Sequence, residues 1–466
     1  MSVDTLVRGG IVVTAERGAQ REDILVRDGR VVGLMADASG LDAAEVIDAT
    51  GRYVFPGVIE PHVHIGIYTP SDGEWYTETC AAACGGITTL INYFFHKDSY
   101  FQSWPPELAI AQRQAVVDFA CHLGIMTEQH ADEMDAYIRE FEVTSFKFTG
   151  HWKGYEKQRI GSDTRIDDGL LYQTLRKAGK YPNVRIAVHS QNVEISIPPF
   201  APPDADHFLK RDSRDARGLD LWEKLNPDFT ETVYAMMALY LAERTGASVY
   251  LVHISAGETV RILRDRHDLR ELNAFAETCA HYLGLDVSSP CGILAKVNPP
   301  VRGGQDQGSL WQGVLDGTLS TVGTDHCAVL KDMKKVESGD VLQARLGFAG
   351  MATLFPVLVT HGVRKRGMSL ERLVEVCSTN TAKIFGLYPR KGTIGPGSDA
   401  DFMVVDLDQR RTASARWIKG VSDFSVFEGE SLYGFPDRTV VRGKTVYQDG
   451  EISTKPGYGI YLPRRA

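Results

Sequence analysis

Apolar and polar positions in the middle of the chain follow the pattern of parallel β-strands joined by helices. Between about Pro56 and Tyr388, eight short apolar runs rich in β-branched residues alternate with amphipathic segments of helix length. Buried parallel strands have such continuous apolar runs, and a crossover helix follows each of them. Eight such units close a (β/α)8 TIM barrel. The runs are GVIEPHVH, ITTLINYF, GIMTEQH, TSFKFTG, VRIAVHS, SVYLVHIS, ELNAFAET and LSTVGTDH.

Two of the segments between these runs carry helix signals at their ends. PPELAIAQRQAVVDFACHL, residues 105–123, begins with prolines, which suit a first helical turn. FTETVYAMMALYLAERTG, residues 229–246, has threonines near its start and ends in glycine, which favours a helix C-terminus. We expect one helix over each segment.

Both ends of the chain show short alternating strands broken by turn residues. In DILVRDGRVVGLM, Asp28 and Gly29 separate two strand-like runs, as a hairpin turn requires. The same pattern of short strand-like runs and turn residues returns after about Gly392. Because these signals flank an α/β centre, we expect the termini to pair into one small β-sandwich. The predicted limits are residues 1–55 and 391–466 for the sandwich and 56–390 for the barrel.

Composition and charge narrow the class of protein. The 466 residues are 43% hydrophobic and 24% charged, as in a globular protein with a large core. The net charge of -9 comes without a long basic run, which argues against nucleic-acid binding. Neither a signal peptide nor an apolar stretch of about 18 residues is found, so we expect no membrane contact.

The seven cysteines indicate a reducing compartment. They are odd in number, scattered from Cys80 to Cys377, and form no CxxC module, so neither a disulfide framework nor a structural zinc site is expected. Cys80 and Cys84 lie four residues apart in an apolar stretch, which favours small core residues over a metal pair. We expect a cytoplasmic protein.

Side chains able to bind metal gather at or near the ends of the strand runs. A lone histidine there is more often a core residue, but the carboxyl ends of all barrel strands meet at one mouth. His62 and His64 alternate across one valine, so both imidazoles face the same side of a strand and can hold one ion. The whole set comprises His62, His64, Lys147, His189, His253 and Asp325.

The segment FPGVIEPHVHIG resembles the first-strand motif of the amidohydrolase superfamily. The similarity is greatest to the dihydropyrimidinase and hydantoinase branch, which also includes allantoinases and dihydroorotases. It extends over nearly the whole chain, through GGITTLINYF, ETCAHYLGLD, KVNPPVR at residues 296–302, VGTDHC and KGTIGPGSDADFMVVD.

The resemblance implies a binuclear metal centre. His62, His64 and Asp325 would hold one ion, and His189 and His253 the other. Lys147 would bridge both ions as an N6-carboxylated lysine, because a free ammonium cannot ligate a cation. Zinc suits these nitrogen and carboxylate ligands best, with manganese or another divalent ion left open. A hydroxide shared by the metals would be the nucleophile, and Asp325 would carry its proton to the leaving nitrogen.

The chain departs from this family pattern at substrate-contacting positions. Trp152 replaces the tyrosine that helps to hold the oxyanion, and an indole N–H can only donate a hydrogen bond. His151 and Tyr155 are near enough to substitute for that tyrosine. Asn298 stands where serine is common, and Leu346 where asparagine is expected. We expect His151, Trp152, Asn298 and Leu346 to contact the substrate. Glu60 replaces the commoner aspartate, and we attach no mechanism to it.

Aromatic residues follow the first two strand runs. Either they cover the barrel mouth, which together with Trp152 would favour a bulky or aromatic substrate, or they anchor their loops. They are Tyr68, Trp75, Tyr100, Phe101 and Trp104.

The resemblance implies an enzyme that hydrolyses a cyclic amide of hydantoin, dihydropyrimidine or cyclic imide type. Alternatives on the same metal site are hydrolysis of an acyclic amide or a lactone, or a decarboxylation. Some relatives are non-enzymatic assembly proteins that have lost ligands, but all six ligand positions are filled here. We expect a small-molecule substrate and, by resemblance, a homodimer or homotetramer.

Overall fold

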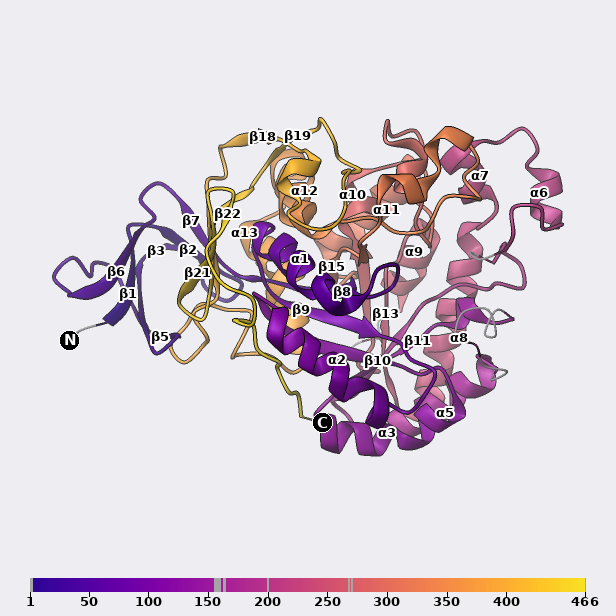
Figure 1. The fold of residues 1–466 in the computed structure, drawn as a ribbon, viewed down its shortest axis with the longest axis horizontal. Helices are drawn as coiled ribbons and strands as arrows, with labels where there is room; N and C mark the ends of the chain where they lie inside the picture. The colour runs from indigo at the N-terminus through magenta and orange to yellow at the C-terminus, as the bar shows by residue number, and fades with distance from the viewer. Residues whose placement is uncertain are drawn as a thin grey trace. The chain divides into compact units, whose positions relative to one another are not determined.

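The computed structural model describes residues 3–154, 161, 165–198, 201–266, 269 and 271–465 (Figure 1). They fall into two compact units. The first comprises Met1–Ile91, Ile110–Ala120 and Ala349–Leu462, and the second Asn92–Ala109, Cys121–Phe348 and Pro463–Ala466. No helix within the described ranges is long and apolar enough to cross a membrane. The domain limits at residues 55 and 390 stay a prediction.

Strands from both ends of the chain share one seven-stranded sheet in the first unit. Its order is β22-β21-β20-β17-β7-β2-β3. β7 (Tyr53–Pro56) pairs antiparallel with β17 (Phe402–Val405) and parallel with β2 (Ile11–Thr14). In Figure 1, indigo β2 and β7 accordingly belong to the same sheet as yellow β21 and β22. A four-stranded sheet, β5-β4-β1-β6, lies in the same unit. The expected β domain built from both termini is confirmed.

The two sheets of this domain pack on a common core. Val7 and Ile24 of the four-stranded sheet belong to the same buried cluster as Val54 and Phe402 of the seven-stranded sheet. The remaining strands are β1 (Val3–Arg8), β3 (Gly18–Arg21), β4 (Asp23–Arg27), β5 (Arg30–Met35), β6 (Ala43–Asp48), β20 (Pro436–Val441), β21 (Lys444–Gln448) and β22 (Glu451–Ile452), with β18 (Arg410–Thr412) and β19 (Ser431–Tyr433) as a separate pair.

The hairpin expected at Asp28–Gly29 is present between β4 and β5. Both residues have positive φ, 51° and 72°. A two-residue type I′ turn needs positive φ at both central positions, which an Asp-Gly pair accepts more easily than most.

The central strands form one sheet of order β15-β14-β13-β12-β11-β10-β9-β8-β16. Its two outermost members, β15 and β16, are separated in sequence only by Thr324 and Asp325. They are therefore two pieces of one strand, and the sheet curls into the predicted barrel. The strands are β8 (Val58–His64), β9 (Ile87–Phe94), β10 (Asp118–Gly124), β11 (Ser145–Phe148), β12 (Arg185–Val188), β13 (Ser248–Leu251), β14 (Phe275–Cys279), β15 (Thr321–Gly323) and β16 (His326–Cys327).

Helices connect successive strands, as the alternating pattern predicts. The predicted helix over residues 229–246 is α8 (Asp228–Thr245), and Gly246 follows it with a φ of 67°. The others are α1 (Ser71–Cys84), α2 (Tyr100–Gln114), α3 (Glu128–Phe141), α5 (Asp168–Ala178), α6 (Phe208–Asp212), α7 (Gly218–Lys224), α9 (Gly257–Asp265), α10 (Ala280–Gly284), α11 (Gly304–Asp316), α12 (Leu354–Val357), α13 (Leu370–Val374) and α14 (Asn380–Ile384).

Shorter helical segments complete the described chain. The π-helical segments are η7 (Leu358–Arg364) and η8 (Glu375–Thr379). The 3-10 helices are η1 (Gly150–Trp152), η3 (Gly292–Ala295), η4 (Lys331–Lys334), η5 (Val336–Ser338), η6 (Met351–Thr353) and η9 (Ala415–Trp417).

The predictions for the third strand and the preceding helix were wrong. α2 begins at Tyr100 and ends at Gln114, and its prolines lie inside it rather than in its first turn. DFACHL, the end of the predicted helix, forms the third barrel strand, β10, together with Gly124, and the rest of the predicted run GIMTEQH comes after it. All seven residues of β10 are buried, so neither face shows the alternation that separates a strand from a helix.

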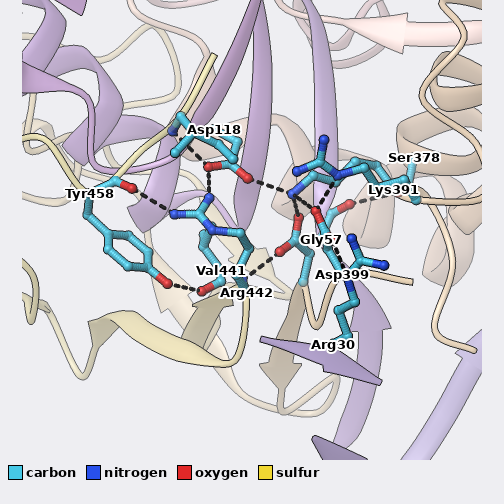
Figure 2. A network of polar contacts seen from close by, with 12 residues as sticks. Arg30, Gly57, Asp118, Ser378, Lys391, Asp399, Val441, Arg442 and Tyr458 are labelled. Carbon is cyan, nitrogen blue, oxygen red and sulfur yellow. Dashed lines mark hydrogen bonds and ion pairs between the residues drawn. The ribbon is translucent and has the colours of Figure 1, made fainter. Parts of the chain in front are cut away.

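A buried ionic network ties the β domain to the start of β10 within the first unit (Figure 2). The Nζ of Lys391 lies 2.6 Å from Asp118 Oδ2, 3.1 Å from Asp399 Oδ2 and 2.5 Å from Asp401 Oδ2. Arg442 bonds to the other oxygen of Asp118. Asp118 is thus held by two cations from the C-terminal part of the chain.

Candidate active site

Lys147 lies in the middle of β11 and is 2% exposed. Its Nζ stands 4.5 Å from the centre of the Tyr93 ring and has no hydrogen-bond partner in the described part of the chain. Burial lowers the pKa of Lys147 to about 8, although the charges of Asp325 and Glu277 oppose that shift. The lowered pKa favours the neutral amine, the form that reacts with carbon dioxide.

Three imidazoles from the second unit lie against one another, one pair edge-on and the other tilted. The ring of His189, just after β12, lies 4.4 Å from that of His253 and 3.7 Å from that of His151, measured between centroids. His189 and His253 are each 2% exposed. The structure therefore brings together both histidines predicted for the second ion, with His151 against them.

The predicted proton carrier, Asp325, lies in the break between β15 and β16. Its φ is 50°, and His253 after β13 has a φ of 42°. Positive φ is unfavourable for residues other than glycine, and such strain concentrates at functional sites. Both backbones turn out of the strand direction where parallel strands end at the barrel mouth.

In the first unit, His62 and His64 both lie on β8, with ring centroids 5.2 Å apart. Oε1 of Glu60, on the same strand, accepts a hydrogen bond from the backbone N–H of His62 at 2.9 Å. His62 and His64 belong to a group of side chains able to hold a metal ion. Imidazole nitrogens with one carboxylate suit zinc.

Trp152 and His151 belong to η1, which follows β11. Gly150 begins this turn, and a Cβ there would lie 2.3 Å from the Tyr234 hydroxyl, so only glycine fits without a shift. Trp152 is 6% exposed, and its ring lies 5.3 Å from that of Phe95. Tyr155, the other candidate to replace the family tyrosine, lies outside the described residues.

The two other predicted substrate contacts lie on neighbouring segments. Asn298 is 8% exposed and its Nδ2 lies 3.4 Å from His189 Nε2. Leu346 packs at the edge of a cluster that includes Trp222 and Val341. The N–H of Gly347, next to Leu346, donates to the carbonyl oxygen of Lys296 at 3.0 Å, which joins the two segments.

Most of the aromatic residues after the first two strands are anchors. Trp75 on α1 and Tyr100 and Trp104 on α2 are at most 1% exposed. The Tyr100 hydroxyl donates to the Gly124 carbonyl at 2.7 Å, which fixes the end of β10. Phe101 is 38% exposed, and its ring lies tilted against that of Tyr137, 5.2 Å away between centroids. These four do not support an aromatic lining of the barrel mouth.

Sequence reasoning missed two groups near the predicted ligands. Glu277 on β14 is fully buried and accepts a hydrogen bond from Tyr250 at 2.8 Å. Gln191 lies 3.0 Å from His189 Nε2. A glutamine is not recognisable as a functional residue from the sequence alone. Glu277, by contrast, is the first residue of the segment ETCAHYLGLD and lies in a predicted strand run, so its position could have marked it.

The comparisons with known proteins cover nearly the entire chain. Residues 235–446 match the model described as "Amidohydrolase family". A D-hydantoinase of Geobacillus stearothermophilus is 33% identical, over 98% of this chain and 96% of that one, and an L-hydantoinase of Paenarthrobacter aurescens is 30% identical, over 99% and 98%. The crystal structure of dihydropyrimidinase from Brevibacillus agri NCHU1002 aligns with a TM-score of 0.88 and 29% identity, covering 99% of this chain and 98% of that one.

Proposed function

This chain belongs to the amidohydrolase family, and from that membership we propose that it is a metal-dependent hydrolase that opens a cyclic amide. The substrate class comprises hydantoins, dihydropyrimidines and cyclic imides, because the similar chains are named hydantoinases and dihydropyrimidinases. D- and L-hydantoinases are similar to it at nearly equal identity, so the proposal leaves stereochemical preference open.

Lys147 is the observation that carries this proposal. A buried amine without a hydrogen-bond partner in the described chain is costly unless it serves a purpose. Carboxylation would give it two oxygens, one for each of two divalent ions. We assign the second ion to His189 and His253, whose rings lie edge-on to each other. We assign the first ion to His62, His64 and Asp325. Zinc fits this donor set.

The reaction adds water across the ring C–N bond. When bound, the two ions supply an acidified water and polarise the amide carbonyl. The Asp325 carboxylate accepts a proton from the water and delivers it to the ring nitrogen as the C–N bond breaks. The carbonyl carbon becomes a carboxylate, and the nitrogen, which stays bonded to the neighbouring carbonyl, becomes the NH₂ of a ureido or carboxamide group at the other end of the opened chain. We assign the developing oxyanion to the Trp152 N–H or to His151, and contacts to the amide ring to Asn298 and Leu346.

A substrate screen tests this function. Purified protein loaded with Zn²⁺ or Mn²⁺ is given hydantoin, 5-phenylhydantoin, dihydrouracil, succinimide, an aryl acetamide and a lactone, and ring opening is followed by mass spectrometry. We expect turnover of at least one cyclic amide, abolished by chelation and by Lys147→Ala. Exclusive turnover of the acyclic amide or the lactone would reassign the reaction, and protein without bound metal and without turnover would refute an enzymatic role.

We further propose a homo-oligomer in the cytoplasm. α8 exposes Phe229, Val233 and Tyr240 by 43%, 50% and 59%, and exposed apolar patches often mark protein interfaces. All seven cysteines lie in the described part of the chain and form no disulfide there, which suits a reducing compartment. Light scattering after size exclusion gives the number of copies.

A further inference from the structure

A buried row of amide groups leads from a backbone carbonyl to His189. Gln191 is 3% exposed and Asn226 is 1% exposed. Asn226 Nδ2 donates to the Trp222 carbonyl oxygen at 2.9 Å, and Gln191 Nε2 donates to Asn226 Oδ1 at 2.7 Å. Gln191 Oε1 lies 3.0 Å from His189 Nε2. The row starts from a group that can only accept a hydrogen bond.

That fixed start determines the orientation of every amide in the row. Because the Trp222 carbonyl only accepts, the NH₂ of Asn226 must face it, and Asn226 Oδ1 then faces Gln191. The Ser196 hydroxyl supports the same orientation of Gln191. It donates its proton to the Asn192 carbonyl oxygen at 3.0 Å, so its oxygen accepts from Gln191 Nε2 at 3.1 Å. The NH₂ of Gln191 is thereby used twice, and its Oε1 must point to His189.

An amide oxygen cannot donate, so His189 must carry a proton on Nε2. In the neutral ring the lone pair then lies on Nδ1, the nitrogen that can ligate a metal. Metal-binding histidines commonly use the second nitrogen in this way, and the partner of that nitrogen fixes the tautomer.

The same oxygen orients Asn298. Asn298 Nδ2 donates to Gln191 Oε1 at 2.7 Å, closer than its 3.4 Å approach to His189 Nε2. All four hydrogen-bonding positions of the Gln191 amide are then occupied. Asn298 Oδ1 is buried and has no hydrogen-bond partner in the chain as described. It is therefore an acceptor available to a bound molecule.

We propose that Gln191 and Asn226 are positioning residues that set two contacts of the active site at once. They hold His189 as its Nε2–H tautomer, with Nδ1 for the metal, and they hold Asn298 with Oδ1 as the acceptor for a ring N–H of the cyclic amide. The metal and the substrate named here rest on the proposed function, whereas the orientation of the two side chains does not.

Two replacements of Gln191 by residues of similar size distinguish its role in orienting His189 and Asn298 from its role in filling space. Gln191→Glu keeps both acceptor positions facing His189 and Asn298, whereas Gln191→Met keeps the approximate length and loses them. Gln307→Met, which removes a bond from Gln307 Nε2 to the Leu285 carbonyl in the same unit, is the matched control. Should Gln191→Met fail to fold, as judged by circular dichroism, Asn226→Leu removes the orienting acceptor and leaves Gln191 in place.

The first measurement uses metal-free protein labelled with ¹⁵N-histidine, in which the His189 signal is assigned by its loss in His189→Gln. We expect the Nε2–H tautomer in the wild type and in Gln191→Glu, and a tautomer mixture in Gln191→Met. The wild-type tautomer in Gln191→Met and in Asn226→Leu would overturn the proposal.

The second measurement is Zn²⁺ affinity by chelator competition, together with KM. Loss of such a partner typically weakens metal binding by about 10–100-fold, so we expect this loss in Gln191→Met but not in Gln191→Glu or Gln307→Met. KM should also rise in Gln191→Met because Asn298 loses its orientation. Equal affinities and KM values in all variants would contradict the proposal. A wild type that binds no Zn²⁺ would refute the proposed function, while the tautomer measurement would still test the amide row.

Discussion

The Nζ of Lys391 lies 2.6 Å from Oδ2 of Asp118, with the two side chains 1% and 0% exposed. Asp399 and Asp401 contact the same ammonium, so Lys391 contacts three buried carboxylates, with Arg442 and Arg390 as further partners of Asp118 and Asp399 (Figure 2). Buried ions are tolerated only when they are paired, and removal of one partner leaves the others uncompensated.

Lys391→Met should therefore lower the free energy of unfolding by about 3–5 kcal/mol, the usual cost of breaking a buried pair. Denaturant unfolding measures the change. Lys383→Met is the control, since the Lys383 side chain is 50% exposed and lies 3.7 Å from Glu16. Equal midpoints for the two variants would mean that the network contributes little.

Lys147→Ala should abolish metal binding, because the proposed bridge is lost. We expect close to two divalent ions per chain in the wild type and almost none in the variant by elemental analysis. Acetate or propionate should restore part of the metal content by replacing the carbamate oxygens. Lys153→Ala, which removes a partly exposed lysine paired with Glu194 at 2.7 Å, should keep both ions. Full activity of Lys147→Ala would remove the bridge from the mechanism.

Asp325→Asn keeps the shape of the side chain but cannot carry a proton from water to the leaving nitrogen. Turnover should fall by at least ~100-fold, as for a positioned acid–base group. Circular dichroism checks that the fold is retained, and elemental analysis checks the metals. If turnover stays near normal with both ions bound, His326 becomes the next candidate for the proton transfer.

Trp152→Phe keeps the aromatic ring against Phe95 and removes the indole donor. If that donor holds the oxyanion, kcat should fall by roughly 100-fold, as for one lost oxyanion contact. If Trp152 only shapes the pocket, KM should change modestly and kcat should persist. Trp152→Tyr should raise the turnover of hydantoin or dihydrouracil only if the missing tyrosine hydroxyl is the sole reason for a low activity on these substrates. We expect no gain, because Asn298 and Leu346 also depart from the family pattern.

Lys296 should make stability depend on pH. It is 2% exposed, lies 4.4 Å over the Trp222 ring, and burial lowers its pKa to about 7 from 10.5. Between these two values the unfolded chain binds more protons than the folded chain, so the free energy of unfolding should rise with pH. Lys296→Met should flatten this rise in denaturant titrations between about pH 7 and about pH 9.5. Replacement of exposed Lys180 by Met should leave it unchanged; the same slope in both variants would contradict the assignment.

The barrel and the β domain could be predicted from the sequence because their apolar patterns are distinct. Strands such as β8 and β9 begin and end close to the predicted runs. β10 could not be separated from its preceding helix, since a strand buried on both faces has no period of two. Only tertiary pairing with β11, for example Leu123 with Phe146, distinguishes it.

From the sequence alone, only those site residues could be predicted whose side chains have recognisable chemistry. His189 and His253 could be named because histidines at strand ends suggest ligands, and the structure places their rings edge-on, 4.4 Å apart between centroids. Gln191 and Asn226 could not, because their contribution depends on which way each amide faces. That orientation follows from contacts to Trp222 and Ser196, which lie 31 and 5 residues from Gln191 along the chain.

The pairing of β7 with β17 has a consequence for synthesis on the ribosome. Val54 faces Val404 across this pair, so about 350 residues must be translated after β7 before its antiparallel partner exists. At ordinary rates of about 5–20 residues per second, that takes roughly 20–70 s. During this time one side of β7 is an unpaired strand edge, the kind of surface that nascent chains aggregate through. We expect chaperone demand during translation to arise from the N-terminal strands, whose sheet is completed last although they are made first.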